Sequence, residues 1–437
     1  MFKYYFMLGL RNLRRNPALT ALMVLTLAIG VAASVSTLTI LHVMSGDPIP
    51  SKSKRLFVPQ FDVGPLAGFT PGEEPGDRQM SYPDAVNLLK APIGERRTAI
   101  YGVSAPIEPA RKDMGVVPAE GLAVAHDFFA MFESPFLHGQ VWSEAQDTAG
   151  ANVVVLSREI SEKLFGAASP VGQPITMMGE PFTIVGVLDK WAPLPHYYRL
   201  IGGDGKFAKD DDIFIPFHTA ARLKTSPQGN MNCSGNPGPG VEGILASDCT
   251  FIQFWVEMKS ASDRAELQSF LTSYSAEQRK LGRHMRAVTP TLYNVGEWMT
   301  YLKVVGNDNK LSAWLAFGFL LLCLVNTVGL LLAKFSVRAA EVGIRRALGA
   351  SRKDIFRQFL VETAVVGLAG GLLGVLLALG ALALISMQSE QMGIVAHMDW
   401  VMLTFTFVLS ITAAILAGLL PTWRACQVTP AMQLKSQ

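Results

Sequence analysis

Residues 18–43 read ALTALMVLTLAIGVAASVSTLTILHV and contain no Asp, Glu, Lys or Arg. A helix of these 26 residues, rising about 1.5 Å per residue, is long enough to cross a hydrocarbon core of about 30 Å. The alternative is a cleaved signal peptide, because a basic leader precedes the run and small residues lie at Ala32 and Ala33. The apolar core of a signal peptide is only about 7–15 residues long. We therefore predict a retained membrane helix.

Three further apolar runs lie near the C-terminus, at residues 311–333, 359–387 and 401–420. Each is long enough to span a bilayer, so the sequence predicts four membrane helices, one before and three after a long polar stretch. Glu362 is the one acidic or basic residue in the three runs, and it lies near the start of its run. We expect its side chain to reach the membrane interface, because a charge at the bilayer centre costs about 2.5–3.5 kcal/mol.

The composition is typical of a membrane protein with a large polar part. Half of the 437 residues are hydrophobic and only 17% are charged, against about 25% in soluble domains. The high apolar content excludes a disordered chain, and four cysteines are too few for a disulfide-dense scaffold. The net charge of +3 gives no reason to expect nucleic acid as a partner.

The distribution of Lys and Arg predicts the orientation of the four helices. Basic residues gather before residue 17, between the second and third apolar runs, and in the tail, whereas residues 388–400 contain none. Since cytoplasmic segments are enriched in Lys and Arg, four spans place both termini in the cytoplasm and residues 45–310 outside. The outer segment has 25 basic and 30 acidic residues, a net charge of −5, and the rest of the chain has a net charge of +8.

The outer segment has the mixed pattern of an α+β domain. Apolar runs typical of strands cover residues 152–156, 182–187, 213–216 and 251–258. Runs with helical spacing cover residues 82–89, 158–165 and 262–281, the last with an N-cap at Ser260 or Ser262.

Residues 226–248 are rich in Gly, Pro, Asn and Ser, and we interpret them as a long loop. Cys233 and Cys249 bracket most of this stretch. Outside the membrane, in an oxidising compartment, we expect them to form a disulfide, which would stabilise the fold by about 3 kcal/mol in the chain-entropy model. Two buried free thiols are the alternative.

No residue pattern indicates catalysis or metal binding. The seven His show no HExxH spacing, and neither a CxxC pair nor a G-x-S-x-G elbow occurs. The nucleotide-binding loop G-x-x-x-x-G-K-S/T is also absent, since Phe207 follows the one Gly-Lys pair, Gly205-Lys206. We expect a non-catalytic chain that holds no metal or cofactor, so another chain has to supply any ATP-driven work.

The basic segment between the second and third apolar runs carries the signals of a short capped helix. Residues 341–351 read EVGIRRALGAS, with apolar and charged residues in helical alternation. Gly349 is a typical helix end, and Ser351 followed by Asp354 predicts a capping box that opens the third span. A basic loop that only sets orientation is the alternative, but a helix with defined ends favours a docking surface. We assign that surface to Glu341, Gly343, Ile344, Arg345, Arg346, Leu348, Gly349 and Ala350.

Two other features point to the membrane. Residues 2–15 place apolar and basic side chains on opposite sides of a helix, which favours a helix in the inner interface over a simple basic leader. In the third apolar run, Gly367/Gly371 and Gly370/Gly374 form two G-x-x-x-G pairs, which let helices approach closely, within the chain or across a dimer.

These motifs together resemble the MacB/FtsX-type permeases of ABC transporters. The segment at 341–351 carries the resemblance most strongly, and the tail adds GLLPTWRA at 418–425 and TPAMQL at 429–434. The outer segment adds DFF at 127–129, VVVLS at 153–157, KLFG at 163–166, PVG at 170–172 and FTIVGV at 182–187. The sequence departs from the family at Met432-Gln433, where an acidic residue is common, in the loop at 233–249, and in lacking the fused ATPase domain of MacB.

The resemblance implies an α-helical protein of a bacterial inner membrane, with four transmembrane helices arranged one plus three and a large α+β periplasmic domain inserted between the first two. We expect an interfacial helix at 1–16, spans at 17–44, 311–334, 358–387 and 401–421, a MacB-like core domain at 45–310, a coupling-helix segment at 335–357, a periplasmic loop at 388–400 and a cytoplasmic tail at 422–437.

The resemblance also implies partners and a function. We expect a dimer with a second copy or a paralogue, and a separate ABC ATPase that binds ATP and Mg²⁺ and docks on the segment at 341–350. ATP-driven motion would be relayed to the periplasmic domain to export a peptide, antibiotic or similar product, with a periplasmic adaptor and an outer-membrane channel. The alternatives are extraction of lipoproteins or lipids from the inner membrane, and FtsX-like regulation of a cell-wall hydrolase.

Overall fold

The computed structural model describes residues 16–72, 79–109, 114–201, 207, 209–387 and 400–426. It contains two compact units, which we call the membrane unit (Met1–Ser45 and Val305–Gln437) and the sheet unit (Gly46–Val304). The predicted interfacial helix, the loop after the third span and most of the tail lie outside the described residues.

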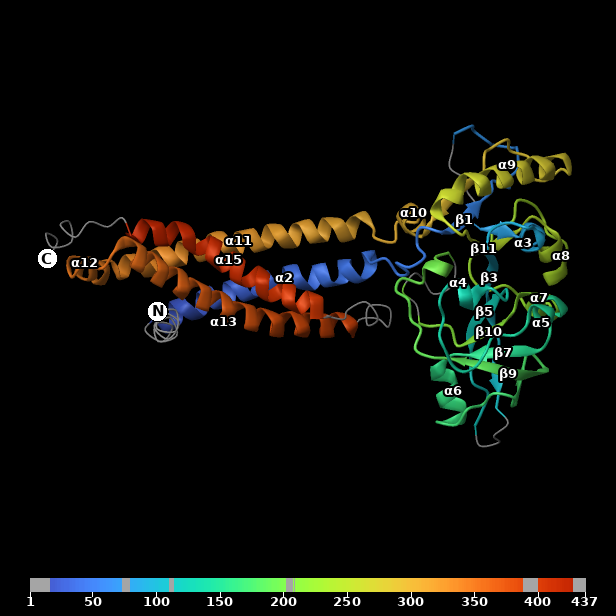
Figure 1. Ribbon diagram of the computed structural model, residues 1–437, viewed down its shortest axis with the longest axis horizontal. Coiled ribbons are helices and arrows are strands. Elements are labelled where there is room, and N and C mark those ends of the chain that lie inside the picture. Colours follow the sequence, from blue (N-terminus) through green and yellow to red (C-terminus); the bar gives the residue numbers. More distant parts are fainter. Residues whose placement is uncertain are drawn as a thin grey trace. The chain divides into compact units, whose positions relative to one another are not determined.

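Among the described residues, the membrane unit has four long apolar helices and one short helix (Figure 1). The helices are α2 (Pro17–Ser45), α11 (Asn307–Val337), α12 (Ala339–Ala347), α13 (Arg352–Ser386) and α15 (Trp400–Cys426). All except α12 are long and apolar enough to cross a membrane. The predicted fold class, four spans arranged one plus three with an α+β domain between the first two, is confirmed.

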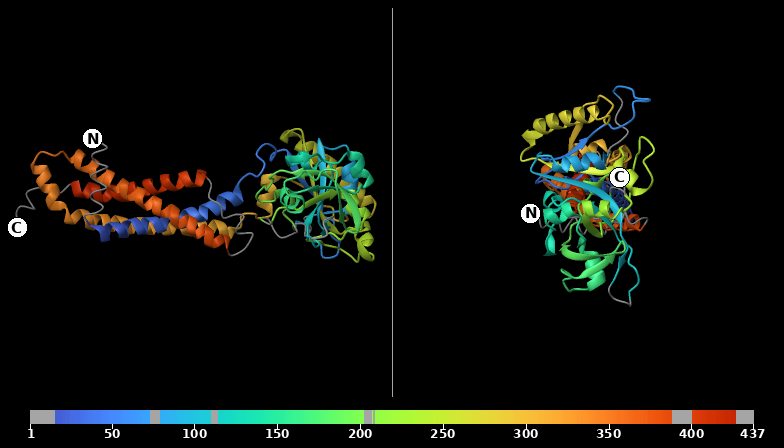
Figure 2. Two further views of the ribbon diagram at one scale, coloured as in Figure 1. Left: turned by 90° about the horizontal axis from the view of Figure 1, so that it is seen from below. Right: turned by 90° about the vertical axis from the view of Figure 1, so that its right-hand side faces the viewer.

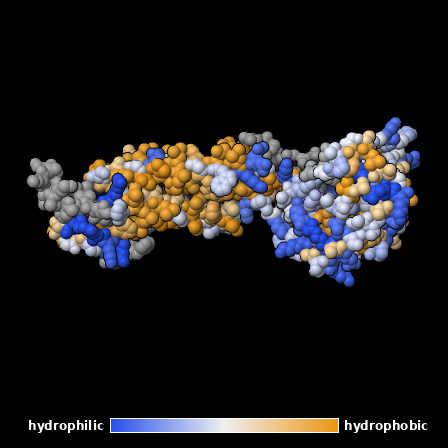
Figure 3. Space-filling model, turned by 90° about the horizontal axis from the view of Figure 1, so that it is seen from above, coloured by the Kyte–Doolittle hydropathy of each residue, from blue (hydrophilic) through white to orange (hydrophobic). Residues whose placement is uncertain are grey.

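The long helices lie side by side, and α2 packs against the other three (Figures 1 and 2). Leu27, Val31 and Val35 of α2 form one apolar core with Leu320 of α11 and with α15. Hydrophobic side chains predominate on the face of the long helices that the space-filling view shows (Figure 3). This distribution is typical of helices surrounded by lipid.

The sheet unit is built on one mixed sheet of twelve strands among its described residues. The strands are β1 (Leu56–Gln60), β2 (Met80–Ser81), β3 (Arg96–Ser104), β4 (Ile107–Glu108), β5 (Glu120–Val124), β6 (Phe136–Gly139), β7 (Val153–Leu156), β8 (Pro174–Met177), β9 (Glu180–Leu188), β10 (Ile213–Pro216), β11 (Thr250–Glu257) and β12 (Thr291–Asn294). Their order is β12-β1-β11-β3-β5-β10-β7-β9-β8-β4, with β2 beside β11 and β6 beside β9. The pairs β5–β10 and β7–β9 are parallel and the others antiparallel.

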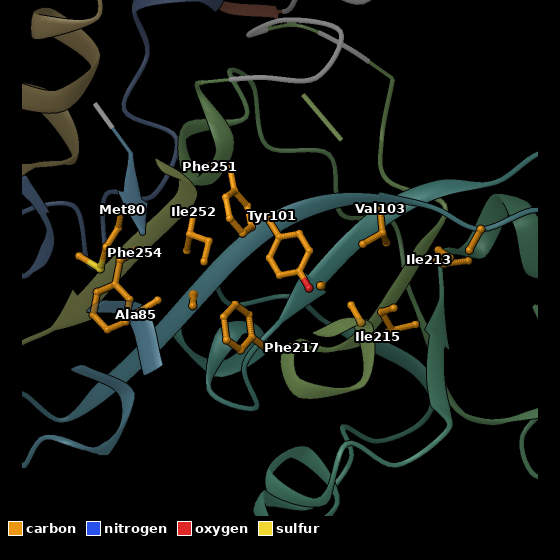
Figure 4. Packing of buried hydrophobic residues seen from close by; sticks show 14 of the residues in the cluster. Met80, Ala85, Tyr101, Val103, Ile213, Ile215, Phe217, Phe251, Ile252 and Phe254 are labelled. Atoms are coloured by element: carbon orange, nitrogen blue, oxygen red, sulfur yellow. The ribbon is translucent and has the colours of Figure 1, made fainter. Parts of the chain in front are cut away.

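Both faces of the sheet are covered, which explains why its central strands are apolar throughout. In β10, Ile213 and Ile215 enter one hydrophobic core while Phe214 enters the core on the opposite face. Tyr101 of β3 lies in the first core, with its ring edge-on to Phe217 and Phe251 (Figure 4). Alternate residues therefore serve two cores, as the period of a strand requires.

The helices of the sheet unit are short, apart from α9. They are α3 (Tyr82–Lys90), α4 (Phe128–Met131), α5 (Glu144–Ala149), α6 (Arg158–Phe165), η1 (Tyr197–Arg199), α7 (Phe217–Arg222), α8 (Gly240–Ala246), η2 (Ala261–Asp263), α9 (Arg264–Lys280) and α10 (Val295–Tyr301). Ser260 caps the short turn η2 that leads into α9.

The interpretation of residues 226–248 as a long loop is wrong in part, because α8 forms within them. Pro239 precedes this helix, and Gly240 and Gly243 lie inside it, so composition alone indicated a loop. The structure joins Cys233 to Cys249, which closes the stretch that contains α8.

Candidate functional site

The short helix α12 is defined at both ends by local backbone chemistry. At its C-terminal end, Gly349 has a φ of +97°, and the amides of Gly349 and Ala350 donate to the carbonyls of Arg346 and Arg345. A backbone in this region favours glycine, and such bonds satisfy the last carbonyls of a helix. The predicted helix end at Gly349 is therefore confirmed.

The next helix, α13, begins at once. The Ser351 hydroxyl accepts from the Asp354 amide at 3.2 Å, which confirms Ser351 as the N-cap. The predicted capping box is wrong in one respect, since the Asp354 carboxylate accepts from the Ser351 hydroxyl instead of the Ser351 amide. With only a few residues between them, α12 and α13 meet at a sharp, capped corner.

The two faces of α12 differ. Val342 is buried in a core with Phe335 of α11 and Ile355 of α13. On the other side, Ile344 is 61% exposed and Leu348, the residue that ends the helix, is 83% exposed. Residues four apart lie on the same face of a helix, so these two side chains form one exposed apolar ridge.

Of the predicted docking residues, Arg345 contacts its own helix and α13, although its side chain is 39% exposed. Its guanidinium donates to Glu341 Oε1 at 2.7 Å and to Gln358 Oε1 of α13 at 2.9 Å. Glu341 in turn accepts from Arg338 Nε at 3.3 Å. Glu341 and Arg345 therefore hold α12 in place, whereas Ile344 and Leu348 point outward.

Glu362 of α13 lies in the middle of a charged cluster. Glu362 is only 1% exposed, so its side chain is buried between helices and does not lie on their outer surface. Its Oε1 is 2.8 Å from Lys334 Nζ of α11, and its Oε2 accepts from Arg338 at 2.9 Å. The Lys334 contact is an ion pair without the angles of a hydrogen bond. Buried charges require such partners.

Lys334, Arg338 and Gln358 were not among the predicted site residues. The signal that points to them is weak, because Lys334 and Glu362 lie on different helices with α12 between them in the sequence. They come together where the end of α11 contacts the start of α13, with Phe335 against Phe359. A lone acidic residue inside an apolar run is nevertheless a reason to look for basic residues near the ends of neighbouring helices.

The two glycine pairs of α13 contact two different helices of the same chain. A Cβ at Gly367 would lie 2.6 Å from Ala414 Cβ of α15, and one at Gly371 would lie 2.9 Å from Ser410 Oγ of α15. On the neighbouring face, a Cβ at Gly370 would lie 2.9 Å from a carbon of Leu27 of α2.

A Cβ at Gly374 would lie 3.3 Å from the Ala28 carbonyl of α2. Ser410 also donates to the Gly367 carbonyl at 2.7 Å. The glycines thus allow α13 to approach α2 and α15 closely. Of the two alternatives that the sequence left open, the structure shows close packing within the chain.

Among the described residues, no group of three or more His, Cys, Asp or Glu side chains is placed to hold a metal ion. The features that stand out are therefore mechanical: a short helix fixed at its corner with α13, an outward apolar ridge, and a buried charge cluster that joins it to two spans.

Comparison with known proteins agrees with this architecture. Residues 20–274, more than half of the chain, match the family described as "MacB-like periplasmic core domain". The chain belongs to this family. Residues 313–430 of this MacB-like chain also match the "FtsX-like permease C-terminal" family. The resemblance to MacB/FtsX-type permeases is confirmed, and the chain is a multi-pass membrane protein.

The relatives of this MacB-like chain include export proteins. The pyoverdine export ATP-binding/permease protein PvdT of Pseudomonas fluorescens is 25% identical over 96% of this chain and 57% of its own length. The macrolide export ATP-binding/permease protein MacB of Azoarcus sp. is 26% identical over 69% of this chain and 40% of its own length. The chain thus spans about half the length of the curated relatives that it matches.

Among solved structures, the periplasmic region of MacB from Actinobacillus actinomycetemcomitans is 13% identical. It matches 58% of this chain and 95% of its own, with a TM-score of 0.37.

Proposed function

We propose that the chain is the membrane permease subunit of an ABC-type export system. In this proposal, an ATPase on a separate chain binds ATP and Mg²⁺ and docks on α12, and its motion is relayed through the membrane unit to the sheet unit. The exported product would be a peptide, an antibiotic or a similar molecule, in line with the pyoverdine and macrolide named for the relatives.

The observation that carries the proposal is the exposed ridge of Ile344 and Leu348. Large apolar side chains on a short, basic helix are costly to leave in water, and they are typical of a surface that a partner covers. Val342, Glu341 and Arg345 anchor the opposite side of the helix to α11 and α13. A partner that binds the ridge therefore contacts an element that cannot move without its neighbours.

The orientation is part of the proposal. The Lys and Arg distribution favours a cytoplasmic α12 and cytoplasmic termini, with the sheet unit on the periplasmic side of a bacterial inner membrane. We further propose a dimer with a second copy or a paralogue, and an adaptor and an outer-membrane channel as further partners. Their support is the family membership alone.

A photo-crosslinking experiment tests the proposal. A benzophenone amino acid replaces Leu348 in the full chain, the cells are irradiated, and the captured protein is identified by mass spectrometry. We expect an ATPase of the ABC type. The matched control is Leu376, which is 66% exposed on α13 and should capture lipid only. Capture of lipid alone at Leu348, or of a protein without a nucleotide-binding loop, would remove the docking assignment.

A further inference from the structure

The charge cluster beneath α12 links basic and acidic residues in a continuous chain of ion pairs. It contains three basic residues, Lys334, Arg338 and Arg345, and two acidic residues, Glu341 and Glu362, each within 3.3 Å of a partner of opposite sign. Lys334 comes from the end of α11, Arg338 from the turn before α12, Glu341 from α12, and Glu362 from α13. One cluster therefore joins three helices.

The surroundings of the cluster are apolar. The rings of Phe335 and Phe359 lie 4.4 Å apart, and the Arg338 guanidinium lies 5.5 Å from the Phe359 centroid. The side chains of Lys334 and Glu362 are each only 2% exposed. Water therefore screens this ion pair little, and the interaction is stronger than that of a surface pair.

A relative movement of these helices would break the cluster. If α13 moved away from the turn between α11 and α12, the buried carboxylate of Glu362 would lose its ion pairs with both Lys334 and Arg338. An unpaired buried charge is strongly unfavourable. A joint movement of the three helices keeps every pair intact, so it is the movement that the cluster permits.

We propose that Glu362 is a positioning residue that fixes the turn between α11 and α12 on α13, so that a displacement of α12 moves both spans together. The inference rests on the proposed function, in which α12 receives the push of an ATPase. Glu362 is not part of the exposed ridge and is not expected to contact the ATPase. Through its ion pairs, a displacement of α12 moves α11 and α13 together and not α11 alone.

The test measures one distance within the full chain in lipid nanodiscs, without any ATPase. Spin labels replace Val337, which is 78% exposed at the end of α11, and Leu376 of α13. Cys323→Ala and Cys426→Ser remove the two cysteines outside the disulfide. Double electron–electron resonance then gives the distribution of the distance between the labels.

The decisive variant is Lys334→Met with Glu362→Leu. It removes one charge of each sign, leaves the Arg338–Glu341 pair, and leaves no buried charge without a partner, so it should fold as the wild type does. Glu362→Gln, which increases the excess of positive charge in the cluster, is measured beside it. Asp308→Asn, an exposed acid-to-amide change at the other end of α11, is the matched control.

We expect a narrow distribution for the wild type and for Asp308→Asn, and at least a doubling of its width in the double variant. An unchanged width in the double variant would overturn the proposal. A double variant that fails to fold would also overturn it, since the pair would then serve assembly and not position. Because no ATPase is present, this result does not depend on whether α12 binds one, so the two proposals can fail separately.

Discussion

The exposed ridge on α12 permits a quantitative prediction for ATPase binding. Fully burying a Leu or Ile side chain contributes about 1.5–3 kcal/mol. Since Ile344 is 61% and Leu348 83% exposed, covering both on docking would contribute about 2–4 kcal/mol. Truncation to Ala keeps the first carbon of each side chain, so we expect Ile344→Ala with Leu348→Ala to lose about 2–3 kcal/mol, which weakens binding about 30- to 150-fold.

The assay is a titration of the purified ATPase, identified by crosslinking, against the full chain in nanodiscs, with the dissociation constant from fluorescence anisotropy. Leu348→Ala alone should have a larger effect than Ile344→Ala, because Leu348 is more exposed. The matched control is Leu376→Ala on the lipid-facing part of α13, which should leave the dissociation constant within twofold. If the double variant also binds within twofold of the wild type, the ridge is not the docking surface.

Three further predictions concern other parts of the chain. Gly367→Val, whose Cβ would lie 2.6 Å from a carbon of α15, should lower stability by about 1–3 kcal/mol and lower the Tm in nanodiscs, whereas Gly380→Val, with no atom within 4 Å of its Cβ, should not. Burial raises the pKa of Asp147 to about 6. Because the folded pKa is raised, the wild type should lose about 3 kcal/mol of stability as the pH rises from about 4 through 6. Asp147→Asn should abolish this pH dependence, measured as local hydrogen exchange, and an unchanged pH profile in the variant would contradict the assignment. Alkylation of unreduced protein should spare Cys233 and Cys249 until reductant is added, and immediate labelling of both would exclude the disulfide.

Features that depend on a few neighbouring residues could be predicted from the sequence. The four spans follow from long apolar runs, and the corner between α12 and α13 follows from Gly349 and Ser351. The central strands could be located because Ile213 and its neighbours are apolar on both faces. In each case the deciding interaction lies within about one turn or one strand.

Features that depend on distant residues could not be predicted from the sequence. The strand order places β1 between β11 and β12, from the opposite end of the sheet unit, and no local pattern encodes that pairing. Glu362 has its partner Lys334 on another helix, so its burial was missed. The helix α8 was missed because its glycines argue against a helix locally, and only tertiary contacts override such propensities.

The central claim is that ATP used by a docked chain changes the sheet unit through α12. Hydrogen exchange of residues 46–304, with and without ATP and vanadate, tests it most directly in nanodiscs that contain the permease and its ATPase. We predict an ATP-dependent change in exchange that disappears in the variant Ile344→Asp with Leu348→Asp and when the ATPase is omitted. Equal exchange with and without ATP in the complete assembly, or a response to ATP by the permease alone, would contradict the claim.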